Sequence, residues 1–201
     1  MDKQVVSKLA NKVALVTGGS RGIGAAIAKR LAADGASVAI TYAKDTGAAS
    51  AVVEAIQRDG GKAIAILADA GDVEAVAAAV EKTVATFGRL DVLVNNAGTA
   101  IPKPFEEATL EEMNRVIDIN IRGVYVATQA ALKHMKRGGR IISIGSAVGE
   151  RVGPPGLVPC RHEGSHEDVQ SGASPRDREP GHHGQQRSAG SDRHGFESRG
   201  G

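Results

Sequence analysis

The chain of 201 residues has no tryptophan, one cysteine and few other aromatic residues. Aromatic residues make up 2% of the sequence and hydrophobic residues 41%, so its core must be built mainly from alanine, valine and isoleucine. Such a core suits closely packed layers of helices and parallel strands. Because Cys160 is the only cysteine, an internal disulfide is excluded, and we expect a protein of the reducing cytoplasm.

Long apolar runs and a strong net charge are also missing. No run reaches the roughly 18 apolar residues that a membrane span needs, and no stretch resembles a signal peptide. The formal net charge of +2 at pH 7 comes without a basic stripe or an aromatic platform for bases. We therefore expect a soluble protein that binds neither membranes nor nucleic acid.

The composition changes sharply after Pro159. All ten lysines lie before this point, whereas residues 160–201 contain no Lys, Leu, Ile, Met, Trp or Tyr. The large apolar side chains of this tail are Val169 and Phe196, too few to offset about 1–2 kcal/mol of backbone entropy per ordered residue. The sequence thus predicts a folded domain over 1–159 and a disordered tail over 160–201.

Short apolar runs alternate with amphipathic stretches along the first part of the chain. Strands are predicted over 13–17, 37–42, 63–68, 90–94 and 140–145. Helices are predicted over 22–33, 46–59, 72–87 and 109–137, the last with a capping box of Thr109 and Glu112. Continuous apolar strands separated by helices indicate a parallel sheet with right-handed crossovers. The predicted fold is α/β, a Rossmann-like doubly wound sheet truncated after about the fifth strand.

A glycine-rich segment, residues 17–24 (TGGSRGIG), joins the first predicted strand to the first predicted helix. Glycine permits a tight turn and a close approach of the backbone to a pyrophosphate, and the amides and dipole of a helix start favour an anion. A turn without a ligand is the alternative, but the position between strand and helix favours phosphate binding. The candidate residues are Gly18, Ser20, Arg21, Gly22, Ile23 and Gly24.

The spacing Gly18-x-x-x-Gly22-x-Gly24 resembles the glycine motif of the short-chain dehydrogenase/reductase family rather than the usual Gly-x-Gly-x-x-Gly. Residues 95–98 (NNAG), after the fourth predicted strand, are similar to the second signature of that family, and Asn120 and Ser146 match two of its catalytic positions. The resemblance spans 11–159 and is strongest to the branch of bacterial 3-oxoacyl-(acyl-carrier-protein) reductases. It implies a homo-oligomeric oxidoreductase that transfers a hydride between a nicotinamide cofactor and a carbonyl or alcohol carbon.

The end of the second predicted strand bears on the choice of cofactor. Folds that select NAD usually carry an acid there for the ribose 2′-hydroxyl, whereas this chain has Tyr42, followed by Lys44. Lys44 and Arg21 can pair with the 2′-phosphate of NADP(H), so NADP(H) is preferred over NAD(H). Asp45 weakens this argument, and an ordinary solvated lysine is the alternative for Lys44.

The resemblance assigns cofactor contacts to a further set of residues. It implies that Asp69 binds the adenine and that Asn96, with Ala97 and Gly98, contacts the cofactor. A turn or helix cap is the alternative for Asp69, and a brace of the turn is the alternative for Asn96. The same resemblance implies that Ser146 orients the substrate oxygen and Asn120 holds a water in the proton path.

The acid/base pair of the family, Tyr-x-x-x-Lys, is absent from this sequence. At its expected place stand residues 160–164 (CRHEG), the two tyrosines are Tyr42 and Tyr125, and no lysine follows Lys136. We therefore expect a weakly active or inactive chain, and we do not expect the family oligomer. A non-catalytic nucleotide-binding remnant or a misfolded product is the alternative.

The sequence of the tail, residues 160–201, suggests why the Tyr-x-x-x-Lys pair is absent. Read one nucleotide later, codons compatible with residues 181–187 permit Gly-Ile-Thr-Val-Asn-Asn-Val, which resembles the sixth strand of the family. The same shift lets residues 160–163 read Ala-Ala-Thr-Lys, as expected after the catalytic tyrosine. We hypothesise a frame change at about Pro159–Cys160.

The tail also contains possible metal ligands: Cys160, His162, His166, His182 and His183. They lack a second closely spaced pair and an apolar scaffold, so no metal site is expected.

Overall fold

A computed structural model describes residues 7–146 of the chain. The strands are β1 (Val13–Val16), β2 (Ser37–Tyr42), β3 (Lys62–Leu67), β4 (Val92–Asn95) and β5 (Arg140–Ser143). The helices are α1 (Gly22–Ala33), α2 (Thr46–Arg58), α3 (Val73–Phe87), α4 (Leu110–Ile117) and α5 (Gly123–Leu132), with a 3-10 turn η1 (Phe105–Glu107) and a π-helical turn η2 (Asp118–Arg122). The predicted tail, the limits of the predicted domain and the hypothesised frame change lie outside the described residues.

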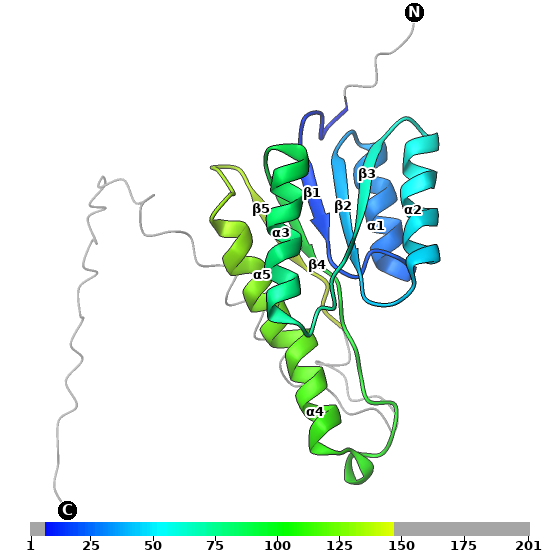
Figure 1. Ribbon diagram of the computed structural model, residues 1–201, viewed down its shortest axis with the longest axis vertical. Coiled ribbons are helices and arrows are strands. Elements are labelled where there is room, and N and C mark those ends of the chain that lie inside the picture. Colours follow the sequence, from blue (N-terminus) through cyan, green and yellow to red (C-terminus); the bar gives the residue numbers. More distant parts are fainter. Residues whose placement is uncertain (1–6, 147–201) are drawn as a thin grey trace, which may run out of the picture. The chain divides into compact units, whose positions relative to one another are not determined.

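The five strands of the described chain form one parallel sheet in the order β3-β2-β1-β4-β5 (Figure 1). β1 pairs with β2 from Val13 opposite Ser37, and with β4 from Ala14 opposite Val92. The outer pairs, β2 with β3 and β4 with β5, are parallel as well. The predicted Rossmann-like, doubly wound α/β fold is thereby confirmed.

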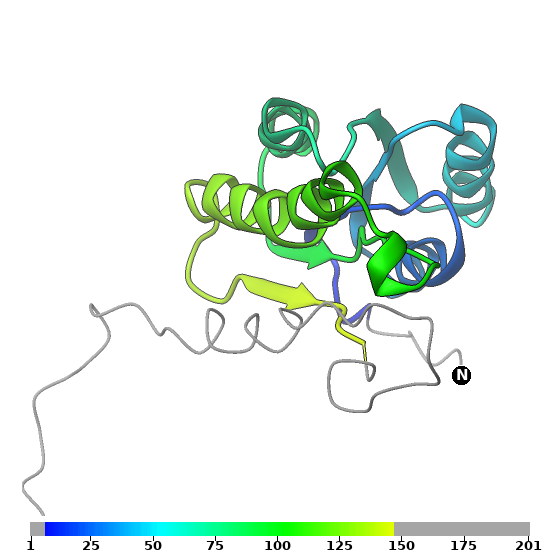
Figure 2. The same cartoon turned by 90° about the horizontal axis from the view of Figure 1, so that it is seen from below.

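Helices cover both faces of this sheet, α1 and α2 on one face and α3 and α5 on the other (Figure 2). Alternate residues of β1 serve the two faces: Val16 packs with the first pair of helices and Leu15 with the second. Ala28 of α1 and Ala131 of α5 are fully buried. Their small side chains bring the helices close to the sheet, as the scarcity of aromatic residues requires. Among the described helices, none has the length and apolar character to cross a membrane.

The order of the strands defines where a ligand can bind. Within the sheet, β2 and β3 lie on one side of the central strand β1, and β4 and β5 lie on the other side of β1. A crevice therefore opens between the carboxyl ends of β1 and β4, which is where doubly wound sheets bind their ligands. The glycine-rich segment follows β1 directly, and the NNAG motif begins with Asn95, the last residue of β4.

The helix predicted over 109–137 is correct at its start and wrong in its extent. The capping box of Thr109 and Glu112 is present. The segment then passes from α4 through the π-helical turn η2 into α5, which ends at Leu132 rather than Arg137.

Tertiary contacts explain both departures. In η2 the N–H of Gly123 donates to the carbonyl of Asp118, five residues earlier, where Gly123 packs so closely on Ala70 that a Cβ would lie 2.1 Å from its carbonyl oxygen. After Leu132 the chain turns so that Met135 packs into the core, and it reverses at Gly138, whose φ is 90°, to reach β5. Helical periodicity in the sequence encodes neither contact.

Candidate cofactor-binding site

The glycine loop lies between β1 and α1 at the switch point of the sheet. Gly22, the first residue of α1, has a φ of 54°, and apart from its chain neighbours and the adjoining backbone of α1 no atom lies within 4 Å of the position that a Cβ would take there. The bare backbone at Gly22 therefore faces open space. Gly24 has the opposite environment, because a Cβ would lie 2.4 Å from the carbonyl oxygen of Gly18. The two positions require glycine for different reasons, the first for its backbone conformation and the second for close packing.

The start of α1 is suited to an anion. No side chain caps the helix, and its first turn carries no acidic residue. The first amides of an α-helix have no partner within the helix and, with the helix dipole, attract negative charge. A dinucleotide pyrophosphate fits this combination of unfilled space and uncapped amides.

Side chains from neighbouring strands hold the glycine loop in place. The Thr17 hydroxyl accepts hydrogen bonds from the backbone N–H groups of Asn96 and Ala97, each at 3.0 Å. The Asn96 amide donates to the carbonyls of Thr17 and Gly18 at 2.9 and 3.1 Å, and Thr41 accepts from the Gly18 N–H at 3.1 Å. The segment after β4 and the end of β2 thus fix the loop before any ligand binds. Asn96 therefore braces the turn, which is the alternative role that its sequence position suggested.

A cavity of about 590 Å³ opens beside the loop. Of the predicted cofactor residues, Gly22 does not line this cavity, although its neighbours in the chain, Arg21 and Ile23, do. The other eleven line it: Gly18, Ser20, Arg21, Ile23, Gly24, Tyr42, Lys44, Asp69, Asn96, Ala97 and Gly98. Residues as far apart in the chain as Gly18 and Ile119 are brought together at this cavity. Its further lining residues, which the sequence analysis missed, are Ala43, Asp45, Ala70, Thr99, Arg115 and Ile119.

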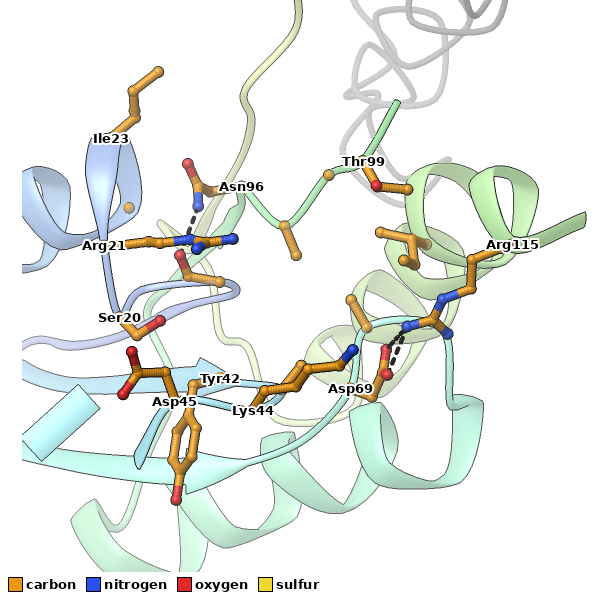
Figure 3. A pocket seen from close by; sticks show the side chains of 17 residues that line it. Ser20, Arg21, Ile23, Tyr42, Lys44, Asp45, Asp69, Asn96, Thr99 and Arg115 are labelled. Atoms are coloured by element: carbon orange, nitrogen blue, oxygen red, sulfur yellow. Dashed lines mark hydrogen bonds and ion pairs between the residues drawn. The ribbon is translucent and has the colours of Figure 1, made fainter. Parts of the chain in front are cut away.

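The charged groups of the cavity divide into paired and unpaired ones (Figure 3). One carboxylate oxygen of Asp45 accepts a hydrogen bond from the N–H of Ala48 at 2.8 Å and caps α2. Asp69 forms an ion pair with Arg115. No ion pair of the described residues includes Arg21 or Lys44. The cavity therefore retains two cations that can meet a phosphate.

Asp69 is held in its ionised form. Burial opposes ionisation of its carboxyl group most strongly, but the hydrogen bond from Gly71, the bonds from Arg115 and the charge of Lys44 together lower its pKa below the ordinary value. The ionised carboxylate accepts hydrogen bonds and donates none. It suits a ligand with an N–H donor.

The two predicted catalytic residues lie outside the lining of this cavity. Asn120 belongs to η2, and its side-chain amide clamps the loop after β4: its oxygen accepts from the Thr99 N–H, and its nitrogen donates to the Thr99 carbonyl, both at 2.9 Å. Ser146 is exposed, three residues beyond the end of β5. The segment 160–164, where the family has its tyrosine and lysine, lies outside the described residues.

Comparison with known proteins agrees with this geometry. Residues 12–158 match the model of the short chain dehydrogenase family. An uncharacterised oxidoreductase of Methylorubrum extorquens is 52% identical over 153 residues, 76% of this chain and 62% of the relative. A hydroxynaphthalene reductase of Aspergillus fumigatus is 47% identical over 148 residues, 74% of this chain and 54% of the relative.

A solved structure shares the fold. The short chain dehydrogenase of Burkholderia cenocepacia, determined in complex with NADP, is 53% identical with a TM-score of 0.73, and the match covers 74% of this chain and 61% of that one. The chain thus spans between 54% and 62% of the length of these three proteins. Because the family model matches residues 12–158, most of this chain, and the glycine loop lies at the switch point of the sheet, this chain belongs to the short-chain dehydrogenase/reductase family.

Proposed function

We propose that this chain binds NADP(H) in the cavity beside the glycine loop, and that it descends from an enzyme transferring a hydride between the nicotinamide and a carbonyl or alcohol carbon. The observation that carries the proposal is the uncapped start of α1 at the glycine loop, where Arg21, Ile23 and Gly24 line the cavity. The pyrophosphate would lie against these amides, with Asp69 at the adenine end. The bound cofactor would supply or accept the hydride; the protein supplies binding and orientation.

The preference for NADP(H) over NAD(H) rests on charge. β2 ends with Tyr42 rather than with an acid, and Arg21 and Lys44 line the cavity. Asp45 also lines the cavity, and one of its oxygens caps α2. The relative from Burkholderia cenocepacia, which contains NADP, supports the same choice. One charge-assisted contact to the 2′-phosphate is worth about 1.5–3 kcal/mol, so we expect at least about tenfold tighter binding of NADPH than of NADH.

The acid/base pair that the family uses for catalysis, Tyr-x-x-x-Lys, is absent from its expected place in this sequence. By resemblance, Ser146 and Asn120 match two catalytic positions of the family; Ser146 would orient a substrate oxygen, and the Asn120 side chain holds the loop at Thr99. A free tyrosine phenol has a pKa of about 10, which the family lysine would have to lower. With neither residue at 160–164, the chain should bind cofactor and turn over little or no substrate. The family match ends at residue 158, which supports the hypothesis of a frame change near Pro159–Cys160.

Two substrate classes suit the lineage. The resemblance to 3-oxoacyl-(acyl-carrier-protein) reductases favours a 3-oxoacyl thioester. The relative named for hydroxynaphthalenes favours a fused-ring hydroxyaromatic compound as the second candidate. A protein in which the family tyrosine and lysine are restored would distinguish these two classes, because it should reduce one of them in preference to the other.

Titration of the purified chain with NADPH and NADH, followed by the fluorescence of the reduced nicotinamide, tests the proposal. We expect saturable binding with NADPH preferred, and no measurable NADPH oxidation with acetoacetyl thioester. A folded chain that binds neither dinucleotide would contradict the binding site, and turnover at ordinary rates would contradict the loss of catalysis. An unfolded chain by circular dichroism would favour the alternative, a misfolded product.

Sequencing the encoding DNA tests the frame change: the shifted frame should continue as a dehydrogenase.

A further inference from the structure

An arginine that the family motifs leave unassigned reaches into the cavity from α4. The Nη2 atom of Arg115 donates to both carboxylate oxygens of Asp69, at 2.7 and 2.6 Å, across 46 positions of the chain. Asp69 follows β3, and one of its oxygens also accepts the N–H of Gly71 at 2.9 Å. Figure 3 shows the two side chains pointing toward each other at one end of the cavity.

Packing holds Arg115 in this position. Its guanidinium lies over the backbone of Gly71, where a Cβ would be 2.3 Å from Nη1. Ile119, one turn further along, lies against the same glycine, since a Cβ there would be 3.2 Å from its Cγ1. The side chains of Arg115 and Asp69 are 46% and 34% exposed, so a ligand in the cavity can reach both.

The hydrogen-bonding capacity of Asp69 leaves room for one donor. An ionised carboxylate accepts about four hydrogen bonds. Asp69 uses three: Oδ1 accepts from Gly71 and from Arg115, and Oδ2 accepts from Arg115. The remaining site is on Oδ2. The exocyclic amino group of an adenine is an N–H donor that such an acceptor site can bind, and the flat guanidinium of Arg115 beside it can stack on a purine ring.

We propose that Arg115 is a positioning residue for the adenine end of the dinucleotide: it fixes the Asp69 carboxylate so that its free oxygen site selects the adenine amino group. The inference rests on the proposed function, because it needs a dinucleotide in the cavity. The competing account is an ion pair that merely ties α4 to the end of β3. That account predicts a loss of stability on substitution but no change in selectivity among purines.

The test compares NADPH with its hypoxanthine analogue, in which an oxygen replaces the amino group. We expect the wild-type chain to bind NADPH at least about tenfold more tightly than the analogue, since a site that holds a polar group rejects a ligand lacking it. Arg115→Met should reduce this preference to less than about threefold, and Arg115→Lys should retain part of it. Affinities come from fluorescence or calorimetry, and melting temperatures report folding.

Arg122→Met is the matched control. Arg122 pairs with Asp118 on the same helical segment but does not line the cavity, so this variant should keep the full preference. Equal wild-type affinity for the two dinucleotides would overturn the inference without any variant, and so would an Arg115→Met protein that keeps the full preference. Failure of the folded wild-type chain to bind either dinucleotide would instead overturn the proposed function, and this inference with it.

Discussion

At the scale of single residues, two glycines with contrasting surroundings test the glycine loop. A Cβ at Gly24 would lie 2.4 Å from the Gly18 carbonyl oxygen and 2.5 Å from the Asn96 amide nitrogen. Gly24→Ala should therefore displace the loop, destabilise the fold by about 1–3 kcal/mol and weaken NADPH binding at least about tenfold. Urea denaturation and NADPH titration measure the two effects.

Gly47→Ala provides the control for this substitution. Gly47 lies in α2, and the one atom near its Cβ position is an Asp45 carboxylate oxygen at 3.5 Å, an ordinary contact. The variant should bind NADPH as the wild type does, and its stability should rise by at most about 1 kcal/mol, because alanine favours the helix. Equal NADPH affinity of the Gly24 and Gly47 variants would mean that the loop is not the binding site.

Residue types also show how far the sequence could lead. The glycine spacing and the NNAG signature are local patterns and identify eight residues that line the cavity; Tyr42, Lys44 and Asp69, which also line it, were predicted from their places after the second and third strands together with the family resemblance. Arg115 could not be found in this way. Its partner Asp69 lies 46 positions earlier, and an arginine on an exposed helix carries no local mark of such a pair.

At the scale of elements, Asp91 joins β1 to β4 at the end of the sheet away from the cavity. Its carboxylate accepts from the Val13 N–H at 3.0 Å and from the side chains of Arg89 and Lys12. Burial raises the pKa of Asp91 most strongly, but the bonds from Arg89, Val13 and Lys12 together lower it below the ordinary value of 3.8. A lowered pKa in the folded state stabilises the fold above the unfolded-state pKa, and this contribution is lost as the pH falls through the folded-state pKa.

Asp91→Ala should destabilise the fold by about 1–3 kcal/mol at pH 7, since the buried Val13 N–H loses its acceptor. The difference from the wild type should narrow as the pH falls below 3.8, where the wild type loses the same contribution. Urea denaturation between pH 3 and pH 7 measures both effects. Asp59→Ala, at an exposed position after α2, should change the stability by less than about 0.5 kcal/mol. A difference that stays constant down to pH 3 would contradict the role of ionised Asp91.

The elements themselves were predicted to different degrees. α1 and β2 have the predicted bounds, because their apolar patterns end at glycines or at turn residues. The segment 109–137 was predicted as one helix, and η2 was missed, since the π-helical turn depends on the contact of Gly123 with Ala70, which is distant in sequence. Local patterns therefore located the helices and strands, while tertiary packing decided where a helix bulges or stops.

At the scale of the whole molecule, the proposed function assigns cofactor binding and proton transfer to different parts of the chain. The described residues 7–146 contain the sheet, the glycine loop and the cavity. The family's tyrosine and lysine would belong to the segment around residue 160, where this sequence has neither. On the proposed function, we therefore expect a chain that binds the dinucleotide and transfers little or no hydride.

Hydrogen exchange with and without saturating NADPH tests this account most directly, because it reports on the backbone amides to which the pyrophosphate is assigned. The account predicts slower exchange over residues 18–24 and 69–72 on addition of NADPH, and little change at the distant end of the sheet around Asp91. Unchanged exchange over residues 18–24 in a folded chain saturated with NADPH would contradict it.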